Sequence, residues 1–250
     1  MQTQTIERAR VKRPAGTAGV VAYAGAAAFA IGAAWFWLAA KRVTVAAAPR
    51  VGPHVTLQQG LRSYYRWQVT TLLQERLYTS IAIAGFLCLA VSAVSLRDLL
   101  TRDRTLARIG ALTIGAGALL WTTGSVVQLG GHRAVGLMAT HTNPIQTTNS
   151  IAFTIDIVAA AFALAAFALI GAGMLALAAA AAREHAGRRA WARYTALVAL
   201  TLLVLAGSYA AGSGNLTDLM LVADGVVLVP VWLIWSGSIG GPGPEPATAA

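Results

Sequence analysis

The sequence predicts an all-α integral membrane protein: a bundle of six transmembrane helices with an extracytoplasmic amphipathic helix or helix extension. Composition is the first observation, because 57% of the 250 residues are hydrophobic and only 11% are charged. A soluble domain of this length needs more charge on its surface, so lipid must be the main solvent. The second is a mean hydropathy of +0.64, and the third is the alternation of long apolar runs with short basic segments.

This pattern divides the chain into three parts, and no internal repeat is visible. Residues 1–17 form a basic N-terminal segment, which we expect in the cytoplasm. Residues 18–236 form the six-helix transmembrane domain. Residues 237–250 are rich in Gly, Pro and Ala, a composition typical of a disordered tail.

The net charge of +10 does not indicate a nucleic-acid-binding protein. The basic residues stand in short clusters between apolar runs, where they orient helices and meet anionic lipid headgroups. We therefore expect the bilayer, including its anionic lipids, as a partner. Other membrane subunits or further copies of the chain are also possible partners. The single cysteine, Cys88, can form no disulfide within the chain, and we interpret it as a small core residue.

The first apolar run, about residues 18–40, has the length of a membrane-spanning helix, which needs roughly 20 residues. A cleaved secretory signal is the alternative, because Ala46–Ala48 offers small residues for cleavage. Signal peptides have shorter apolar regions of about 7–15 residues, so we favour the spanning helix. Gly25 and Gly32 lie one heptad apart, which predicts that a neighbouring helix approaches closely there.

Residues 61–77 form an amphipathic segment before the second spanning run, about 79–96. Leu61, Tyr65 and Val69 share a helical face, which arginines flank. The segment is either an anchor helix at the membrane surface or an outward extension of the second spanning helix. We favour an anchor helix over a ligand-binding role.

The remaining runs predict spanning helices at about 109–129, 144–182, 194–211 and 218–235. Basic turns follow the second and fourth helices, and a tight turn at Gly212–Asn215 follows the fifth. The glycines of residues 109–119 indicate close helix packing. An unbroken helix over 144–182 would be about 58 Å long, whereas the hydrocarbon core is about 30 Å thick. Its first turns must therefore stand outside the lipid, or the helix must kink, with Gly171 and Gly173 as the hinge.

The distribution of Lys and Arg predicts the orientation. The N-terminal segment and the turns after the second and fourth helices hold four each, whereas the turns after the third and fifth hold one and none. This pattern predicts a multi-pass plasma-membrane protein with both termini in the cytoplasm. The first external section is an exception with six basic residues, which we assign to the amphipathic segment.

Polar residues gather in the stretch 130–156, on the predicted extracytoplasmic side. Asn143 and Pro144 predict a helix start there, with Asn as N-cap and Pro at the first helical position. Trp121, Ser125, Gln128 and His132 also form a stripe along one face of the third helix. A shared polar cluster is therefore possible at this end, and its candidate ligand- or proton-site residues are Gln128, His132, Arg133, His141, Asn149, Asp156 and Asp224.

Acidic residues inside apolar segments suggest a functional site. Asp218 is better explained as a residue at a helix start, where a carboxylate is favoured. Asp224 lies inside the sixth apolar run and needs a polar partner, for which we expect Arg133 or His141, with Asn149 or Gln146 adding hydrogen bonds. A purely structural network is an equally good interpretation, because buried polar groups must be satisfied whether or not they function.

No catalytic residue, metal site or cofactor is predicted. The histidines His132 and His141 are nine residues apart across a loop, which is not a recognised ligand spacing. The sequence also lacks the common catalytic and nucleotide-binding motifs. The leading interpretation is a non-enzymatic accessory or scaffolding subunit. The alternative is a small-solute or proton-coupled carrier that uses the intramembrane Asp and His residues, although the cytoplasmic half of the spans is poor in strongly polar groups. A membrane-embedded enzyme is the third interpretation.

Overall fold

The computed structural model describes residues 16–47, 57–140, 144–184 and 188–239, all of them helical or in turns between helices. Side chains are described in these ranges except at 39–47, 57–58, 60–72 and 140. Six helices are long and apolar enough to cross a membrane, which confirms the predicted all-α multi-pass bundle. The elements are α1 (Thr17–Ala47), α2 (Leu57–Leu99), α3 (Arg104–Thr140), α4 (Ile145–Ala182), α5 (Arg189–Ala211), α6 (Gly214–Val222), the π-helical turn η3 (Ala223–Leu228) and α7 (Val229–Ile239).

The helices form a ring in chain order. Each of α1 to α4 packs against the next helix, and α1 closes the ring by packing against α7 and η3. The segments α6, η3 and α7 follow one another without a break and make the sixth spanning helix. We call the end with Thr17 and Ile239 the terminal end, and the end where α3 gives way to α4 the distal end.

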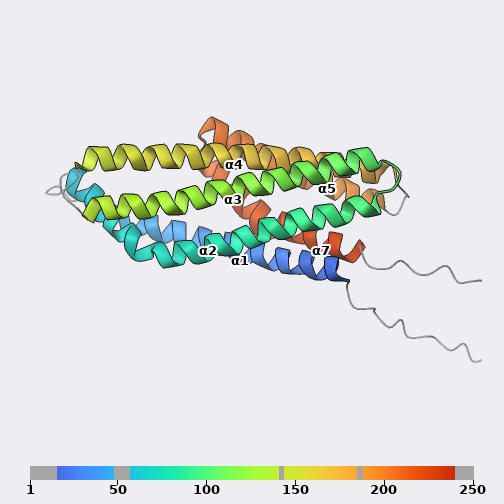
Figure 1. The fold of residues 1–250 in the computed structure, drawn as a ribbon, viewed down its shortest axis with the longest axis horizontal. Helices are drawn as coiled ribbons and strands as arrows, with labels where there is room; N and C mark the ends of the chain where they lie inside the picture. The colour runs from blue at the N-terminus through green and yellow to red at the C-terminus, as the bar shows by residue number, and fades with distance from the viewer. Residues whose placement is uncertain (1–15, 48–56, 141–143, 185–187, 240–250) are drawn as a thin grey trace, which may run out of the picture.

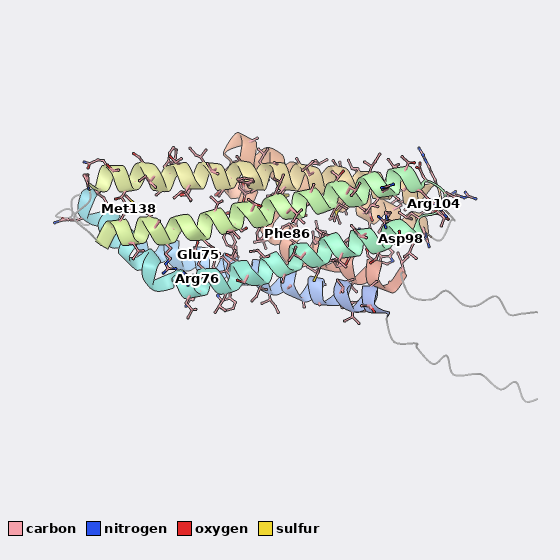
Figure 2. The ribbon with its side chains drawn as sticks, in the orientation of Figure 1. Glu75, Arg76, Phe86, Asp98, Arg104 and Met138 are labelled. Atoms are coloured by element: carbon pink, nitrogen blue, oxygen red, sulfur yellow. The ribbon has the colours of Figure 1, made fainter. Side chains whose placement is uncertain are left out.

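The helices α2, α3 and α4 reach beyond the turn between α5 and α6 toward the distal end (Figure 1). Figure 2 shows this length, with Asp98 and Arg104 near the terminal end and Met138 near the distal end. The helix α2 is continuous from Leu57 to Leu99. The amphipathic segment is therefore an extension of the second spanning helix, one of the two predicted alternatives.

The helix α4 is likewise α-helical throughout, so its first turns extend past the turn between α5 and α6 instead of folding back. Gly171 and Gly173 are packing positions within it: an added Cβ would lie 3.0 Å from the Ala199 carbonyl oxygen and 2.7 Å from that of Gly110, respectively. The helix begins at Ile145 with Pro144 as its N-cap, one residue later than predicted. The turn between α2 and α3 is also shorter than expected, because residues 97–99 and 104–108 are helical.

Glycines at heptad spacing bring α3 and α4 together. A Cβ added at Gly110, Gly117, Gly124 or Gly131 would lie only 2.6–2.7 Å from an atom of α4. At Gly110 and Gly117 the nearest atom is a backbone carbonyl oxygen, so the observed approach leaves no room for a larger residue there. The predicted close approach at Gly25 and Gly32 is also present, and the neighbouring helix there is α2.

Polar contacts join the turns between helices at the terminal end. The backbone N–H of Arg102 donates to the buried carboxylate of Glu184 at 2.8 Å, and Nη1 of Arg102 donates to the Arg183 carbonyl at 2.9 Å. Arg183 pairs with Asp103, and Arg188 donates to the carbonyl of Leu99 at 2.6 Å. These contacts tie the turn between α2 and α3 to the segment between α4 and α5.

Candidate functional site

A cavity of about 730 Å³ lies inside the ring, and all six spanning helices contribute to its wall. Its size is within the range of about 300–1,000 Å³ that small-molecule sites occupy. Along α4 the wall extends from Asn149 to Ile170, about 32 Å at 1.5 Å per residue. The predicted stripe on α3, from Trp121 to His132, faces this cavity with all four of its residues.

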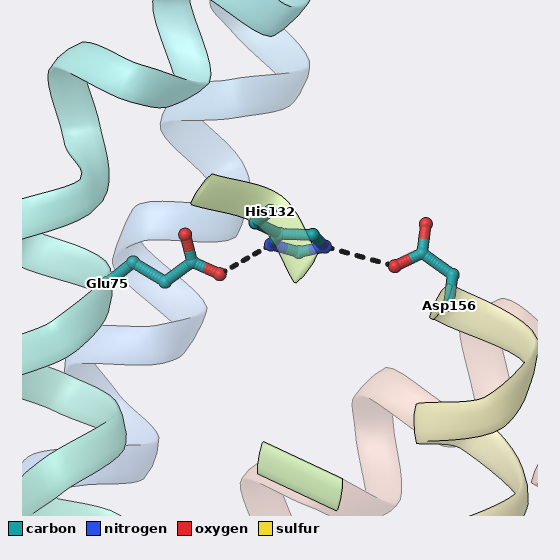
Figure 3. Close-up of polar contacts among 3 residues, drawn as sticks. All are labelled: Glu75, His132 and Asp156. Atoms are coloured by element: carbon teal, nitrogen blue, oxygen red, sulfur yellow. Dashed lines mark hydrogen bonds and ion pairs between the residues drawn. The ribbon is translucent and has the colours of Figure 1, made fainter. Parts of the chain in front are cut away.

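Three side chains from three helices meet at the distal part of the cavity (Figure 3). Nδ1 of His132 on α3 lies 2.7 Å from Oε1 of Glu75 on α2. Nε2 of His132 lies 3.1 Å from Oδ1 of Asp156 on α4. The side chains of His132 and Glu75 are only 11% and 13% exposed, whereas that of Asp156 is 56% exposed. The cavity therefore reaches the surface beside Asp156, and we call these three residues the mouth triad.

Which atoms donate in the mouth triad depends on where its protons lie. A neutral imidazole has one N–H donor, and an ionised carboxylate can only accept. Both contacts of His132 are thus hydrogen bonds only if the ring carries both protons or if one carboxyl group is protonated. In either arrangement the triad joins α2, α3 and α4, and at least one of its two contacts is a charge-assisted hydrogen bond.

Asp224 lies deeper in the cavity wall, on the π-helical turn η3. The residue is only 3% exposed. The hydroxyl of Thr201 on α5 donates to its Oδ1 at 2.6 Å, whereas its Oδ2 has no hydrogen-bond partner among the described residues. The Thr201 hydroxyl also lies 2.8 Å from the Val198 carbonyl oxygen, so its single proton serves two acceptors.

The π-helical turn and the proline after it set the position of Asp224 in the wall. The N–H of Val229 bonds to the carbonyl of Asp224, five residues back, instead of four. Pro230 follows directly and has no N–H to offer the preceding turn. Such π-bulges occur frequently at functional sites.

Aromatic rings make up much of the wall around the middle of the cavity. The rings of Phe86 and Trp121 stack with centroids 4.1 Å apart, and Phe29 meets Phe86 edge-on at 4.8 Å. Phe167 and Tyr209 stack at 6.0 Å. All five rings line the cavity, which therefore combines apolar surface with a few polar groups.

The charged residues of the wall are almost all acidic. Glu75, Asp156, Asp218 and Asp224 line the cavity together with His132, and the described lining includes no Lys or Arg. Asp218 is exposed and is the fifth residue of α6, which begins at Gly214. It therefore lies one turn inside the helix, not at the helix start as predicted, and belongs to the cavity rim.

Five predicted site residues share this cavity: Gln128, His132, Asn149, Asp156 and Asp224. Arg133 is exposed on α3 and is not part of the wall. The partner found for Asp224 is Thr201, and Gln146 is exposed outside the cavity. His141 lies outside the described residues.

Glu75, Thr201 and the aromatic wall of the cavity were not predicted from the sequence. Glu75 carried a signal, because it is the only acidic residue between Glu7 and Asp98 and stands among arginines. Thr201 carried none, since a hydroxyl in an apolar run often bonds to its own helix.

No group of three His, Cys, Asp or Glu residues in the described part of the chain is placed to hold a metal ion. Comparison with known proteins gives no assignment either: no protein-family model, no curated protein and no solved structure matches the chain.

Proposed function

We propose that the protein is a membrane carrier that binds a small solute in the cavity between its six helices. The observation that supports this is Asp224, a buried carboxylate on the cavity wall with one oxygen that no described group satisfies. Buried polar groups in structural networks are almost always fully paired. A protein interior is also normally close-packed, whereas here about 730 Å³ stays open.

The described wall of the cavity is exposed at its distal part, beside Asp156. Toward the terminal end the bundle is filled by fully buried side chains, among them Ile114, Met174, Leu177, Trp232 and Leu233. A carrier with a central site opens to one side at a time by moving helices around that site. This packed region would be the gate that such a movement opens.

We further propose that the distal mouth faces outward from the plasma membrane and that both termini are cytoplasmic. Eight arginines, in the turn regions 97–108 and 183–193, gather at the terminal end. Basic residues near spanning helices favour the cytoplasmic side. The solute would then enter from outside the cell.

A pair of neighbouring substitutions tests whether the cavity holds a solute. Ala160 lines the cavity, whereas Ala161 on the same helix is exposed and is not part of the wall. Ala160→Trp should fill the cavity, and Ala161→Trp should leave it open. Wild type and both variants are purified in native lipid discs, and their retained small molecules are measured by mass spectrometry. We expect a solute in the wild type and in Ala161→Trp that is lost from Ala160→Trp. Absence of any such solute from the wild type contradicts the proposal.

An accessory subunit is the second candidate, because α2, α3 and α4 extend past the other spans. This extension exposes large apolar side chains that do not line the cavity, including Leu137 at 49% and Ile151 at 36%. Exposed apolar patches outside lipid typically mark contacts with other proteins. Purification in mild detergent distinguishes the two roles, since an accessory subunit should retain a stoichiometric protein partner whether or not Ala160 is replaced.

A further inference from the structure

The charges on the cavity wall disfavour anions. Four carboxylates line it, and the described wall has no Lys or Arg to balance them. His132 lies between Glu75 and Asp156, so its ring partly offsets the charge of these two. Nothing basic among the described lining residues offsets Asp224. An anionic solute would meet like charge at both the mouth and the depth of the cavity.

Asp224 has no cationic partner among the residues that the structure describes. Within the same residues its Oδ2 has no hydrogen-bond partner, and the hydroxyl beside Oδ1 is shared with the Val198 carbonyl. A buried carboxylate is stable when it is paired with a positive charge. The cavity is the open space from which that charge can come.

The surroundings of Asp224 favour an organic cation over a metal ion. Inorganic cations require several oxygen ligands at close range, and no group of three His, Cys, Asp or Glu residues in the described part of the chain is placed to supply them. The cavity is also far larger than a single ion. Its wall carries the stacked rings of Phe86 and Trp121, and aromatic faces attract organic cations.

We propose that the solute is an amphiphilic organic cation, whose positive group pairs with Asp224 and whose apolar body contacts the aromatic wall around Trp121. This inference deepens the proposed carrier function and rests on it. The mouth triad then provides a second acidic region at the entrance, where the side chain of Asp156 remains 56% exposed.

Two ions of the same shape and opposite charge test this selectivity. Full-length protein in discs of zwitterionic lipid is titrated with tetraphenylphosphonium and, separately, with tetraphenylborate, and binding to empty discs is subtracted. We expect saturable binding of the cation only. Asp224→Asn should weaken it roughly ten-fold or more, because the charge partner is lost. The control, Asp98→Asn, removes an exposed carboxylate at the terminal end and should leave binding unchanged.

Three results would overturn the cation assignment: equal binding of both ions, no saturable binding of the phosphonium, or unchanged binding by a folded Asp224→Asn variant. If that variant does not fold, Ala160→Trp provides the check, because the assignment requires it to abolish phosphonium binding. The two proposals fail separately. A native solute lost only from Ala160→Trp would keep the carrier function even if the phosphonium does not bind.

Discussion

The two halves of the bundle differ in how their buried polar groups are hydrogen-bonded. Between the terminal end and the level of Ile170, which we call the terminal half, Trp191 donates to Ser236 and Trp232 donates to Thr195. The hydroxyl of Ser92 is the exception, without a partner among the described residues. In the remaining distal half, the open cavity lies beside a smaller core of Val135, Ala139, Ile145 and Ala152, and the unsatisfied group is a carboxylate.

This difference separates stability from function. A neutral hydroxyl without a partner costs little compared with a buried carboxylate in the same state. Proteins tolerate such a cost in stability where the group binds a ligand. Substitutions in the terminal half should therefore lower stability most, and substitutions at the cavity wall should affect binding more than stability.

The largest loss of stability should come from the terminal half. Trp232 is fully buried and bonds to Thr195, so Trp232→Ala should cost about 3–5 kcal/mol through the void it leaves. Trp121→Ala enlarges a cavity that is already open and should cost less. Thermal unfolding in detergent measures both variants. Equal losses would show that the distal wall is packed as tightly as the terminal core.

The next effect concerns the contact between α3 and α4. Gly117→Ala would place a methyl group 2.7 Å from the Ala166 carbonyl oxygen, so the helices must separate. Gly115 lies two residues away with nothing within 4 Å of an added Cβ. Gly115→Ala should therefore be neutral or stabilising, by up to about 1 kcal/mol from helix propensity. Unfolding midpoints measure both variants, and equal midpoints for Gly117→Ala and Gly115→Ala would contradict the close contact between α3 and α4.

A smaller effect is expected at the mouth triad. His132→Ala leaves Glu75 largely buried without its ring partner, which should cost about 1–3 kcal/mol. The neighbouring exposed residue supplies the control, because Arg133→Ala should change the unfolding midpoint very little. A similar midpoint for wild type and His132→Ala would mean that the triad does not hold the three helices together.

The orientation of the protein in the membrane can be tested with substitutions that should barely change stability. Gln146 and Ala182 are exposed residues near opposite ends of α4. On a Cys88→Ala background, an impermeant thiol reagent added to intact cells should label Gln146→Cys and not Ala182→Cys. The opposite labelling would place the cavity mouth on the cytoplasmic side.

The fold was largely predictable because the length of an apolar run determines whether it can cross a bilayer. The six spans, the tight turn at Gly212 and the packing role of Gly110 and Gly117 follow from local sequence. Whether residues 61–77 lie on the membrane or extend α2 could not be decided from sequence. Both arrangements place an apolar face on a helix of the same pattern.

The site was predictable only in part. Periodicity along α3 placed His132 on the cavity side, and the same geometry places Arg133 about 100° around the helix, away from it. Neighbouring polar residues in sequence were therefore not neighbours in the site. The contacts of His132 with Glu75 and of Asp224 with Thr201 depend on how separate helices are aligned, which no local pattern specifies.

The unfolding midpoint of ligand-free Asp224→Leu tests most directly whether Asp224 serves a ligand or the fold. Leucine removes the unsatisfied oxygen, and the Thr201 hydroxyl keeps the Val198 carbonyl as its acceptor. Replacing buried charges by apolar groups of similar volume is often neutral or stabilising. We predict a midpoint equal to or above that of the wild type. A clear decrease for Asp224→Leu, with Asp224→Asn unchanged, would make Asp224 a structural residue and would contradict the proposed binding role.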